Sequence, residues 1–239
     1  DATFQKEYIA SKIYKKYLPT PEVNLMKLNV QGNYLGMYVN TESINKQFAK
    51  KHFDYDDGAL FKCDASGMFC DTTGTPPGGY PGLTWYGSSD STLYYSSYDR
   101  KSNHGWKEFI DMIYALNFTP NNLDSFLNID RVLWAFAVNT VIGNFDTYNG
   151  YYVHNYYMYQ TEDGIFQMIP WDLSQSFINA LLGWDIFTPM GPNHPAHYDP
   201  YYGADPTLAR PLTAYLFNNA DRKSTRLNSS HRCISYAVF

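Results

Sequence analysis

The sequence IDRVLWAFAVNTVIGNFDTYNGYYVHNYYMYQTEDGIFQMIPWD, at residues 129–172, decides the fold that the chain is expected to adopt. Apolar residues from Ile129 to Val141 recur at helical spacing over several turns, which predicts a helix with one buried face. Asn128 is a suitable N-cap for it, and Gly143 ends it. A polar loop and two strand-like segments then follow within the quoted stretch, so we predict a helix, a loop and a β-hairpin in that order.

Three polar side chains lie at the edges of this hairpin, whose strands we predict at His154–Tyr159 and Ile165–Ile169. Asp146 is in the preceding loop, Asn155 begins the first strand, and Asp172 follows the second. Protein kinases use this order, with one loop acid, one downstream Asn and one acid after the next strand. Mg²⁺ prefers oxygen ligands, commonly one or two carboxylates together with phosphates. On this logic Asp146 would accept or orient the substrate hydroxyl, and Asn155 and Asp172 would ligate metal.

Each of these residues also has a purely structural interpretation. Asp146 could cap a turn, Asp172 could N-cap a helix that starts at Leu173, and Asn155 could satisfy backbone groups of the loop. In ordinary kinases the Asn lies about five residues after the base Asp, and the interval here is longer. His154 could be a base, but a histidine that precedes a run of tyrosines on a strand is more often packed or hydrogen-bonded.

Working outward from this segment, the chain divides into parts of different composition. Residues 1–63 predict a partial N-terminal lobe made of a helix, a hairpin, a second helix from Glu42 to Phe53 and a short strand. Residues 64–103 are rich in Gly, Pro, Ser and Tyr, which predicts a long loop or insertion. Residues 104–220 then form a C-terminal lobe that contains the hairpin. The fold class that follows is α+β, with a small β-rich lobe before a mainly helical lobe.

Composition excludes several classes of protein. The chain has 239 residues, 44% of them hydrophobic, which is enough for one large domain or two small lobes. Aromatic residues reach 18% and charged residues only 17%, so the chain is folded rather than disordered. The formal net charge of −5 argues against nucleic-acid binding. The sequence contains no apolar run long enough to predict a transmembrane segment. The chain starts at Asp1 without a Met, and we expect it to be truncated at the N-terminus.

Residues 221–239 differ abruptly from the rest, because they are basic and Ser-rich. The first part, DRKSTRLNSSH, is the in-frame translation of a common sequencing adapter, and the last part, ISYAVF, translates the stretch that follows its barcode. We therefore expect an adapter-derived tail that is not native, the alternative being a disordered tail. Cys63 and Cys70 are then the remaining cysteines, and they could form a small disulfide loop or stay free thiols.

Several segments resemble the CotH (spore coat protein H) kinase family, and the resemblance covers most of residues 1–180. The two most specific motifs are HNYYMY and IPWDL. The segments are NVQGNYLGMYVNTESINKQF (29–48), GALFK (58–62), RVLWAFAVNTVIGNFDTY (131–148), HNYYMY (154–159) and FQMIPWDLSQSF (166–177). The resemblance implies an atypical, secreted-type protein-kinase-like fold with a catalytic β-hairpin. It also implies that ATP and Mg²⁺ or Mn²⁺ are used to phosphorylate Ser or Thr of coat or cell-surface proteins.

The matching positions assign roles to individual residues. Asp146 resembles the catalytic acid, Asp172 the metal-binding acid, and Asn155 the asparagine beside it. Glu42 and Lys62 match the small-lobe pattern of the family. A kinase pairs a Lys on the ATP phosphates with a helix Glu, and Lys62 and Glu42 could be that pair.

The chain also departs from the kinase pattern. Lys62 follows Glu42, whereas in ordinary kinases the Lys comes first, so an alternative is an ATP-contacting lysine upstream of Asp1. A surface salt bridge is the other interpretation of the two residues. The sequence contains no GxGxxG loop, and Ser174 stands where the family pattern often has a further acid.

The function predicted from the sequence is ATP- and metal-dependent phosphorylation of proteins outside the cytoplasm, that is, extracellular, on the cell surface or in a spore coat. Its partners would be ATP and a protein substrate. The first alternative is a non-catalytic coat or surface protein of kinase-like fold that binds proteins or glycans through its aromatic residues. A second alternative is phosphorylation of a small molecule or sugar, because a fold does not name its acceptor.

Overall fold

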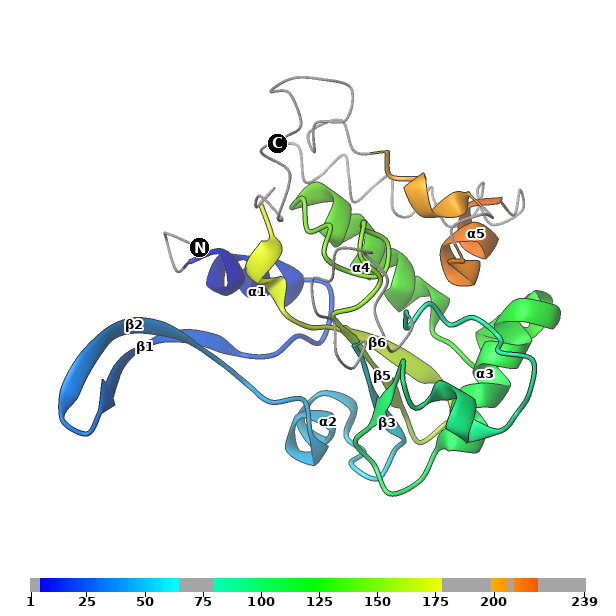
Figure 1. Ribbon diagram of the computed structural model, residues 1–239, viewed down its shortest axis with the longest axis horizontal. Helices are drawn as coiled ribbons and strands as arrows, with labels where there is room; N and C mark the ends of the chain where they lie inside the picture. Colours follow the sequence, from blue (N-terminus) through cyan, green and yellow to red (C-terminus); the bar gives the residue numbers. More distant parts are fainter. Residues whose placement is uncertain (1–4, 65–79, 178–198, 206–208, 219–239) are drawn as a thin grey trace.

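The computed structural model combines helices with two small antiparallel sheets, in agreement with the predicted α+β class (Figure 1). It describes residues 5–64, 80–177, 199–205 and 209–218. The predicted tail, Cys70 and much of the predicted insertion lie outside these ranges. None of the described helices is long and apolar enough to cross a membrane.

The central sheet has four strands in the order β4-β3-β5-β6. They are β3 (Leu60–Cys63), β4 (Asp99–Arg100), β5 (Tyr156–Gln160) and β6 (Phe166–Pro170). The hairpin predicted after the polar loop is β5–β6, with Tyr156 opposite Pro170. Strand β3 lies on its other side, so that Lys62 is opposite Tyr157. The sheet therefore brings residues before position 64 next to the predicted catalytic hairpin.

Alternate residues of the sheet face two different apolar clusters, as the two-residue period of a strand requires. Phe61, Met158 and Met168 face the large core. That core also receives buried side chains of α3 (Trp106–Phe118), α4 (Ile129–Val141) and α5 (Pro211–Asn218). Leu60 and Ile169 belong to the smaller cluster, which α2 (Lys46–Phe53) covers. The hairpin is thus fixed from both faces, a suitable support for the loops at its ends.

Helix α4 forms as its sequence predicts. The side chain of Asn128 accepts a hydrogen bond from the N–H of Arg131, the expected N-cap interaction. Gly143 has a φ of 59°, the left-handed conformation that ends helices. The polar loop therefore begins directly after the buried helix.

The N-terminal part contains α1 (Lys6–Tyr14) and a hairpin of β1 (Val23–Val30) and β2 (Asn33–Thr41). The turn is formed by Gln31 and Gly32, both with positive φ. The hairpin extends away from the body of the molecule in Figure 1, and most of its side chains are exposed. It pairs with no third strand among the described residues.

Helix α2 starts later than its sequence suggests. We predicted a helix from Glu42, but the side chain of Asn45 accepts hydrogen bonds from the N–H groups of Gln47 and Phe48 and so caps a helix that begins at Lys46. Glu42 consequently lies between β2 and α2 and is not a helix residue.

The described end of the predicted insertion, residues 80–103, contributes to the core. It contains a 3₁₀ turn, η1 (Ser91–Tyr94), and the short strand β4. Tyr94 and Tyr98 are fully buried. Cys63, at the end of β3, is a buried free thiol.

Candidate functional site

The loop between α4 and β5 carries Asp146, and a tight turn fixes its shape. The N–H of Tyr151 donates to the carbonyl oxygen of Phe145 at 2.7 Å. Gly150 passes so close to that residue that a Cβ atom on it would lie 1.9 Å from the same oxygen. Because real Cβ atoms do not approach an oxygen so closely, only glycine fits this position, and the path of the backbone next to Asp146 is set.

A buried chain of amide groups connects this loop to α1 and α4. The hydroxyl of Tyr14 donates to Oδ1 of Asn139, which also accepts from Nδ2 of Asn144 at 3.2 Å. The Nδ2 atom of Asn139 donates to Oδ1 of Asn149 at 2.9 Å. Buried polar groups that find partners in this way order the segments they join. The loop is therefore hydrogen-bonded to α4 and, through Asn139, to α1.

Arg210 holds the same loop from the side of α5. Its guanidinium is buried and donates to the carbonyl oxygens of Tyr148, Gly150 and Tyr151, the last at 2.9 Å. Arginine presents several N–H donors in a rigid plane, which suits it to bind several carbonyl groups at once. The sequence analysis did not identify Arg210.

Asp146 and Asn155, two of the predicted site residues, are in direct contact. The Nδ2 atom of Asn155 donates to the backbone oxygen of Asp146 at 3.0 Å and to its carboxylate Oδ2 at 3.2 Å. The proposed structural role of Asn155, satisfying loop backbone, is thus correct. It coexists with a contact to the predicted catalytic carboxylate.

His154 contacts the other carboxylate oxygen of Asp146. Its Nε2 atom lies 2.5 Å from Oδ1 of Asp146, and its Nδ1 atom lies 3.3 Å from Oδ1 of Asp64. Burial lowers the pKa of His154, but the hydrogen bonds to both carboxylates outweigh burial and raise it to about 9. The imidazole is therefore a cation at neutral pH, and it donates to a carboxylate on each side.

Asp64 in turn belongs to an ion pair. The Nζ atom of Lys62 lies 2.6 Å from Oδ2 of Asp64. The hydrogen bond from His154, supported by the contact with Lys62 and opposed by burial, lowers the pKa of Asp64 to about 2. A row of alternating charges thus runs from β3 to the loop: Lys62, Asp64, His154 and Asp146.

Asp172 follows β6, and the residue before it, Trp171, is hydrogen-bonded to Asn155 through the backbone. The N–H of Trp171 donates to the carbonyl oxygen of Asn155 at 3.2 Å. One carboxylate oxygen of Asp172 accepts from the N–H of Ser174 at 3.2 Å and caps η3 (Leu173–Gln175), as the structural interpretation proposed. No residue in the described part of the chain donates a hydrogen bond to Oδ2 of Asp172 or to Oδ1 of Asn155.

Both residues also have an unusual backbone. Asn155 has a φ of 57° and Asp172 a φ of 47°, in the left-handed region. Asn and Asp tolerate this conformation better than other non-glycine residues, although it still costs about 1 kcal/mol or more. Strained backbone of this kind concentrates at functional sites. It also explains why β5 begins at Tyr156, two residues later than predicted.

Glu7 is a further carboxylate near Asp172 that the sequence analysis missed. It lines a small cleft together with Thr41 and Asp172. Thr41 donates to Oε1 of Glu7 at 2.7 Å. Burial raises the pKa of Glu7 against this hydrogen bond, and the negative charge of Asp172 raises it further. Helical spacing places Glu7 on the same face of α1 as Ala10, Ser11 and Tyr14, all buried, and this is the signal that could have identified it.

The other two predicted residues, Glu42 and Lys62, have different partners. Glu42 pairs with Nζ of Lys51 at 3.3 Å and accepts from the N–H of Glu22 at 2.9 Å, near the surface. Lys62 pairs with Asp64. The structure thus brings Asp146 and Asn155 together, with Lys62 at the far end of the charge row, and it does not bring Glu42 to this site.

The hairpin end carries oxygen atoms of the kind that hard cations bind. Within the described ranges, three or more His, Cys, Asp or Glu residues do not gather into a potential metal cluster. Asn155 and Asp172 nevertheless each carry an oxygen that accepts no hydrogen bond from the described residues, and Mg²⁺ typically takes one or two protein oxygens with substrate phosphates. These two residues could therefore hold Mg²⁺ or Mn²⁺ only together with ligands from a substrate.

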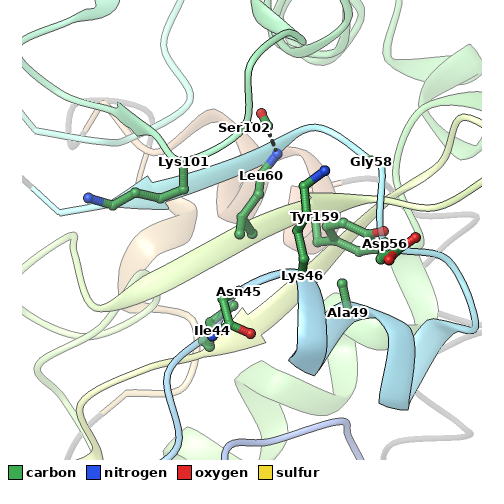
Figure 2. A pocket seen from close by; sticks show the side chains of 10 residues that line it. All are labelled: Ile44, Asn45, Lys46, Ala49, Asp56, Gly58, Leu60, Lys101, Ser102 and Tyr159. Carbon is green, nitrogen blue, oxygen red and sulfur yellow. Dashed lines mark hydrogen bonds between the residues drawn. The ribbon is translucent and has the colours of Figure 1, made fainter.

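A larger cavity lies elsewhere, between α2 and the ends of β3 and β5. Figure 2 shows the side chains that line it, among them Ile44, Ala49, Leu60 and Tyr159. The cavity has a volume of about 310 Å³. None of the five predicted site residues lines it. The two lysines at its rim, Lys46 and Lys101, pair with Asp57 and Asp99.

The match with a family model places the chain among kinase-like proteins. The model for CotH kinase protein matches residues 1–221 of the 239. The chain belongs to the CotH kinase protein family, and the resemblance stated from sequence segments is confirmed. The match ends at the first residue of the predicted tail. A search among curated proteins found no match.

Proposed function

We propose that this protein is an ATP- and divalent-metal-dependent phosphotransferase of atypical kinase-like fold. It phosphorylates Ser or Thr of secreted, coat or cell-surface proteins. The observation that supports this most directly is the geometry of Asp146, whose two carboxylate oxygens contact His154 and Asn155 at 2.5 and 3.2 Å in a loop held by Gly150 and Arg210. Membership of the CotH kinase protein family supports the reaction type and a coat or surface location.

Asp146 is the proton acceptor in this proposal. The substrate hydroxyl oxygen forms a bond to the γ-phosphorus of ATP while the bond from that phosphorus to the bridging oxygen breaks, and ADP leaves. The hydroxyl proton passes to the carboxylate of Asp146. The N–H of His154 and the amide of Asn155 hold this carboxylate in one orientation, which is what positioning catalysis requires.

The proposed metal ligands are Asn155, through its Oδ1 atom, and Asp172, through its Oδ2 atom. A bound divalent ion neutralises charge on the phosphates. Both residues have a left-handed backbone at the hairpin end, and the hydrogen bond from Trp171 to Asn155 ties Asn155 to the residue that precedes Asp172. Lys62 keeps donors beyond the one that faces Asp64, since an ammonium group has three, and we propose that it contacts the ATP phosphates.

We also propose Glu7 instead of Glu42 as the small-lobe glutamate. Kinases place this residue on a helix. Glu7 is on α1 and shares a cleft with Asp172, whereas Glu42 lies outside any helix and pairs with Lys51. Glu42 matches the small-lobe pattern of the family in sequence, but the packing of α1 against η3 favours Glu7.

The test is transfer of radioactive phosphate from ATP to a Ser/Thr-rich acceptor panel, with Mg²⁺ or Mn²⁺. Asp146→Asn and Asp172→Asn keep side-chain size and tolerance of left-handed backbone. We expect transfer to fall by about 10²- to 10⁴-fold in Asp146→Asn. Asp57→Asn, which removes an exposed partner of Lys46, is the matched control and should transfer at the wild-type rate. Full activity of correctly folded Asp146→Asn would exclude this role.

One observation favours a second function, namely a non-catalytic coat or surface protein that binds partners or glycans. The β1–β2 hairpin exposes a group of large apolar side chains, of which Tyr34 is 58% and Leu35 53% exposed. Exposed apolar patches often mark interaction sites. ATP-dependent thermal stabilisation with Mg²⁺ or Mn²⁺ separates the two functions, because ligand binding to the native state raises the melting temperature.

A further inference from the structure

We propose that Asp64 is a positioning residue for phosphotransfer, which acts through His154 on the catalytic carboxylate of Asp146. This inference rests on the proposed function of Asp146. Asp64 has no counterpart in the set of residues predicted from the sequence, and it comes from the end of β3, far from the loop along the chain.

The contacts of His154 define what Asp64 does. The imidazole has two nitrogens, and each faces one carboxylate: Nδ1 is 3.3 Å from Asp64 and Nε2 is 2.5 Å from Asp146. A carboxylate that contacts one ring nitrogen fixes the orientation of the imidazole and so aims the other nitrogen. With Asp64 in place, the ring is held at Nδ1 and Nε2 points at Oδ1 of Asp146. Without Asp64 the ring has no anchor at Nδ1 and can rotate, so the carboxylate of Asp146 is held less firmly.

Asp64 is itself held in position from two sides. Lys62 contacts its second oxygen at 2.6 Å. The strand that ends next to it, β3, pairs with β5 through the opposed residues Cys63 and Tyr156, directly after Asn155. Asp64 is partly buried, with 25% of its side chain exposed. The orientation of Asp146 therefore depends on how β3 is seated beside β5, in addition to its own loop.

This arrangement predicts an effect on turnover at saturating ATP. Asp64 contacts neither proposed metal ligand, but it pairs with Lys62, the residue proposed to contact the ATP phosphates. Its loss should lower kcat for protein phosphorylation at saturating ATP by about 10- to 100-fold, the usual size for a group that orients a histidine, whereas a change in KM for ATP alone would report on Lys62. Asp64→Asn keeps an oxygen that accepts from Nδ1–H, and its kcat should lie between those of Asp64→Ala and the wild type.

The experiment is a double-mutant cycle in the complete 239-residue chain. It compares Asp64→Ala, His154→Gln and the double variant, with Asp57→Asn as control. If Asp64 acts through His154, Asp64→Ala lowers kcat in the wild type and has little further effect in His154→Gln. An additive loss, or an unchanged kcat in Asp64→Ala, overturns the proposal. Thermal melts confirm that each variant is folded.

A second readout does not depend on activity. In ¹H–¹⁵N spectra of the imidazole groups, the wild type should show an Nδ1–H signal of His154 that is protected from exchange, and Asp64→Ala should lose that protection. If the wild type transfers no phosphate, the proposed function fails while this measurement still tests the contact. If transfer is normal and depends on Asp146 but the spectra of wild type and Asp64→Ala coincide, the positioning role fails alone.

Discussion

The Nε2 atom of His154 and the Oδ1 atom of Asp146 lie 2.5 Å apart, with a second carboxylate, from Asp64, on the opposite side of the imidazole ring. A strand histidine next to tyrosines predicted a packed or hydrogen-bonded side chain. The structure shows a buried and hydrogen-bonded one, since His154 links two acids, and its charge offsets the repulsion between them.

This link predicts how stability depends on pH. The pKa of His154 is raised from its ordinary 6.5 to about 9. The stabilisation is therefore fully present below about pH 6.5 and is lost as the pH rises through 9. Urea unfolding between pH 6 and 9.5 should show the wild-type advantage over His154→Gln shrinking with pH. A difference that stays constant across this range would contradict the prediction.

For Asp64, the dependence of stability on pH has the opposite sign. The pKa of Asp64 is lowered from 3.8 to about 2, so its contribution is present above pH 3.8 and lost as the pH falls through 2. Asp64→Asn should accordingly lose less stability relative to the wild type at pH 2 than at pH 5. His154 is hydrogen-bonded to Asp64. The stability of the same variant above pH 6.5 therefore also tests the contribution of His154.

Gly150→Ala should damage the loop that carries Asp146. The new Cβ would meet the carbonyl oxygen of Phe145 at 1.9 Å, so the backbone must shift or the turn must open. We expect a loss of about 2 kcal/mol or more in the free energy of unfolding, together with a fall in kcat. Gly87→Ala is a control without steric contact, although its positive φ adds a small strain. Equal stability of both variants in urea unfolding would show that the turn is not as tight as described.

Arg210→Ala should loosen the same loop without touching Asp146. Three carbonyl oxygens, of Tyr148, Gly150 and Tyr151, lose their buried donor, and each unsatisfied group costs about 1 to 3 kcal/mol unless water replaces the arginine. Hydrogen exchange of residues 145–152 should accelerate. Arg100→Ala, on exposed β4, should leave the exchange of this segment unchanged. Unchanged exchange in Arg210→Ala would mean that the loop is held by the Asn139 network alone.

The thiol of Cys63 should be unreactive in the native protein. It is fully buried, and burial raises its pKa well above 9, so the thiolate that reacts is scarce at neutral pH. Peptide mapping after iodoacetamide treatment should find Cys63 modified only after unfolding. Rapid native labelling would show that β3 opens readily, which would also weaken the positioning role of its neighbour Asp64.

The local elements of the fold could be predicted because their signals are close together in the sequence. Helix α4 has a regular apolar face and an Asn cap, and the β5–β6 hairpin has its turn at Gly164. The contact of Asp146 with Asn155 followed from the same segment. The late start of α2 could not be predicted from apolar spacing, since the cap at Asn45 decides it.

The rest of the site could not be predicted because its contacts join distant segments. Asp64 and His154 are 90 positions apart, and Arg210 and Gly150 are 60 apart. No periodicity marks these residues, and the neighbouring sequence does not distinguish Asp64 or Arg210 from an ordinary charged side chain. Glu7 is the exception, since it shares a helix face with buried residues and could have been recognised by that spacing alone.

The hold of Arg210 on the loop has a consequence for biosynthesis. The carbonyl groups that it binds are made first, and the arginine joins the chain 60 residues later than Gly150. We expect the loop of the nascent protein to stay unfixed until that arginine has left the ribosome. The proposed phosphotransfer would then begin only at a late stage of translation. Stalled chains that end before and after residue 210 should therefore differ in protease cleavage between Asn144 and Tyr152.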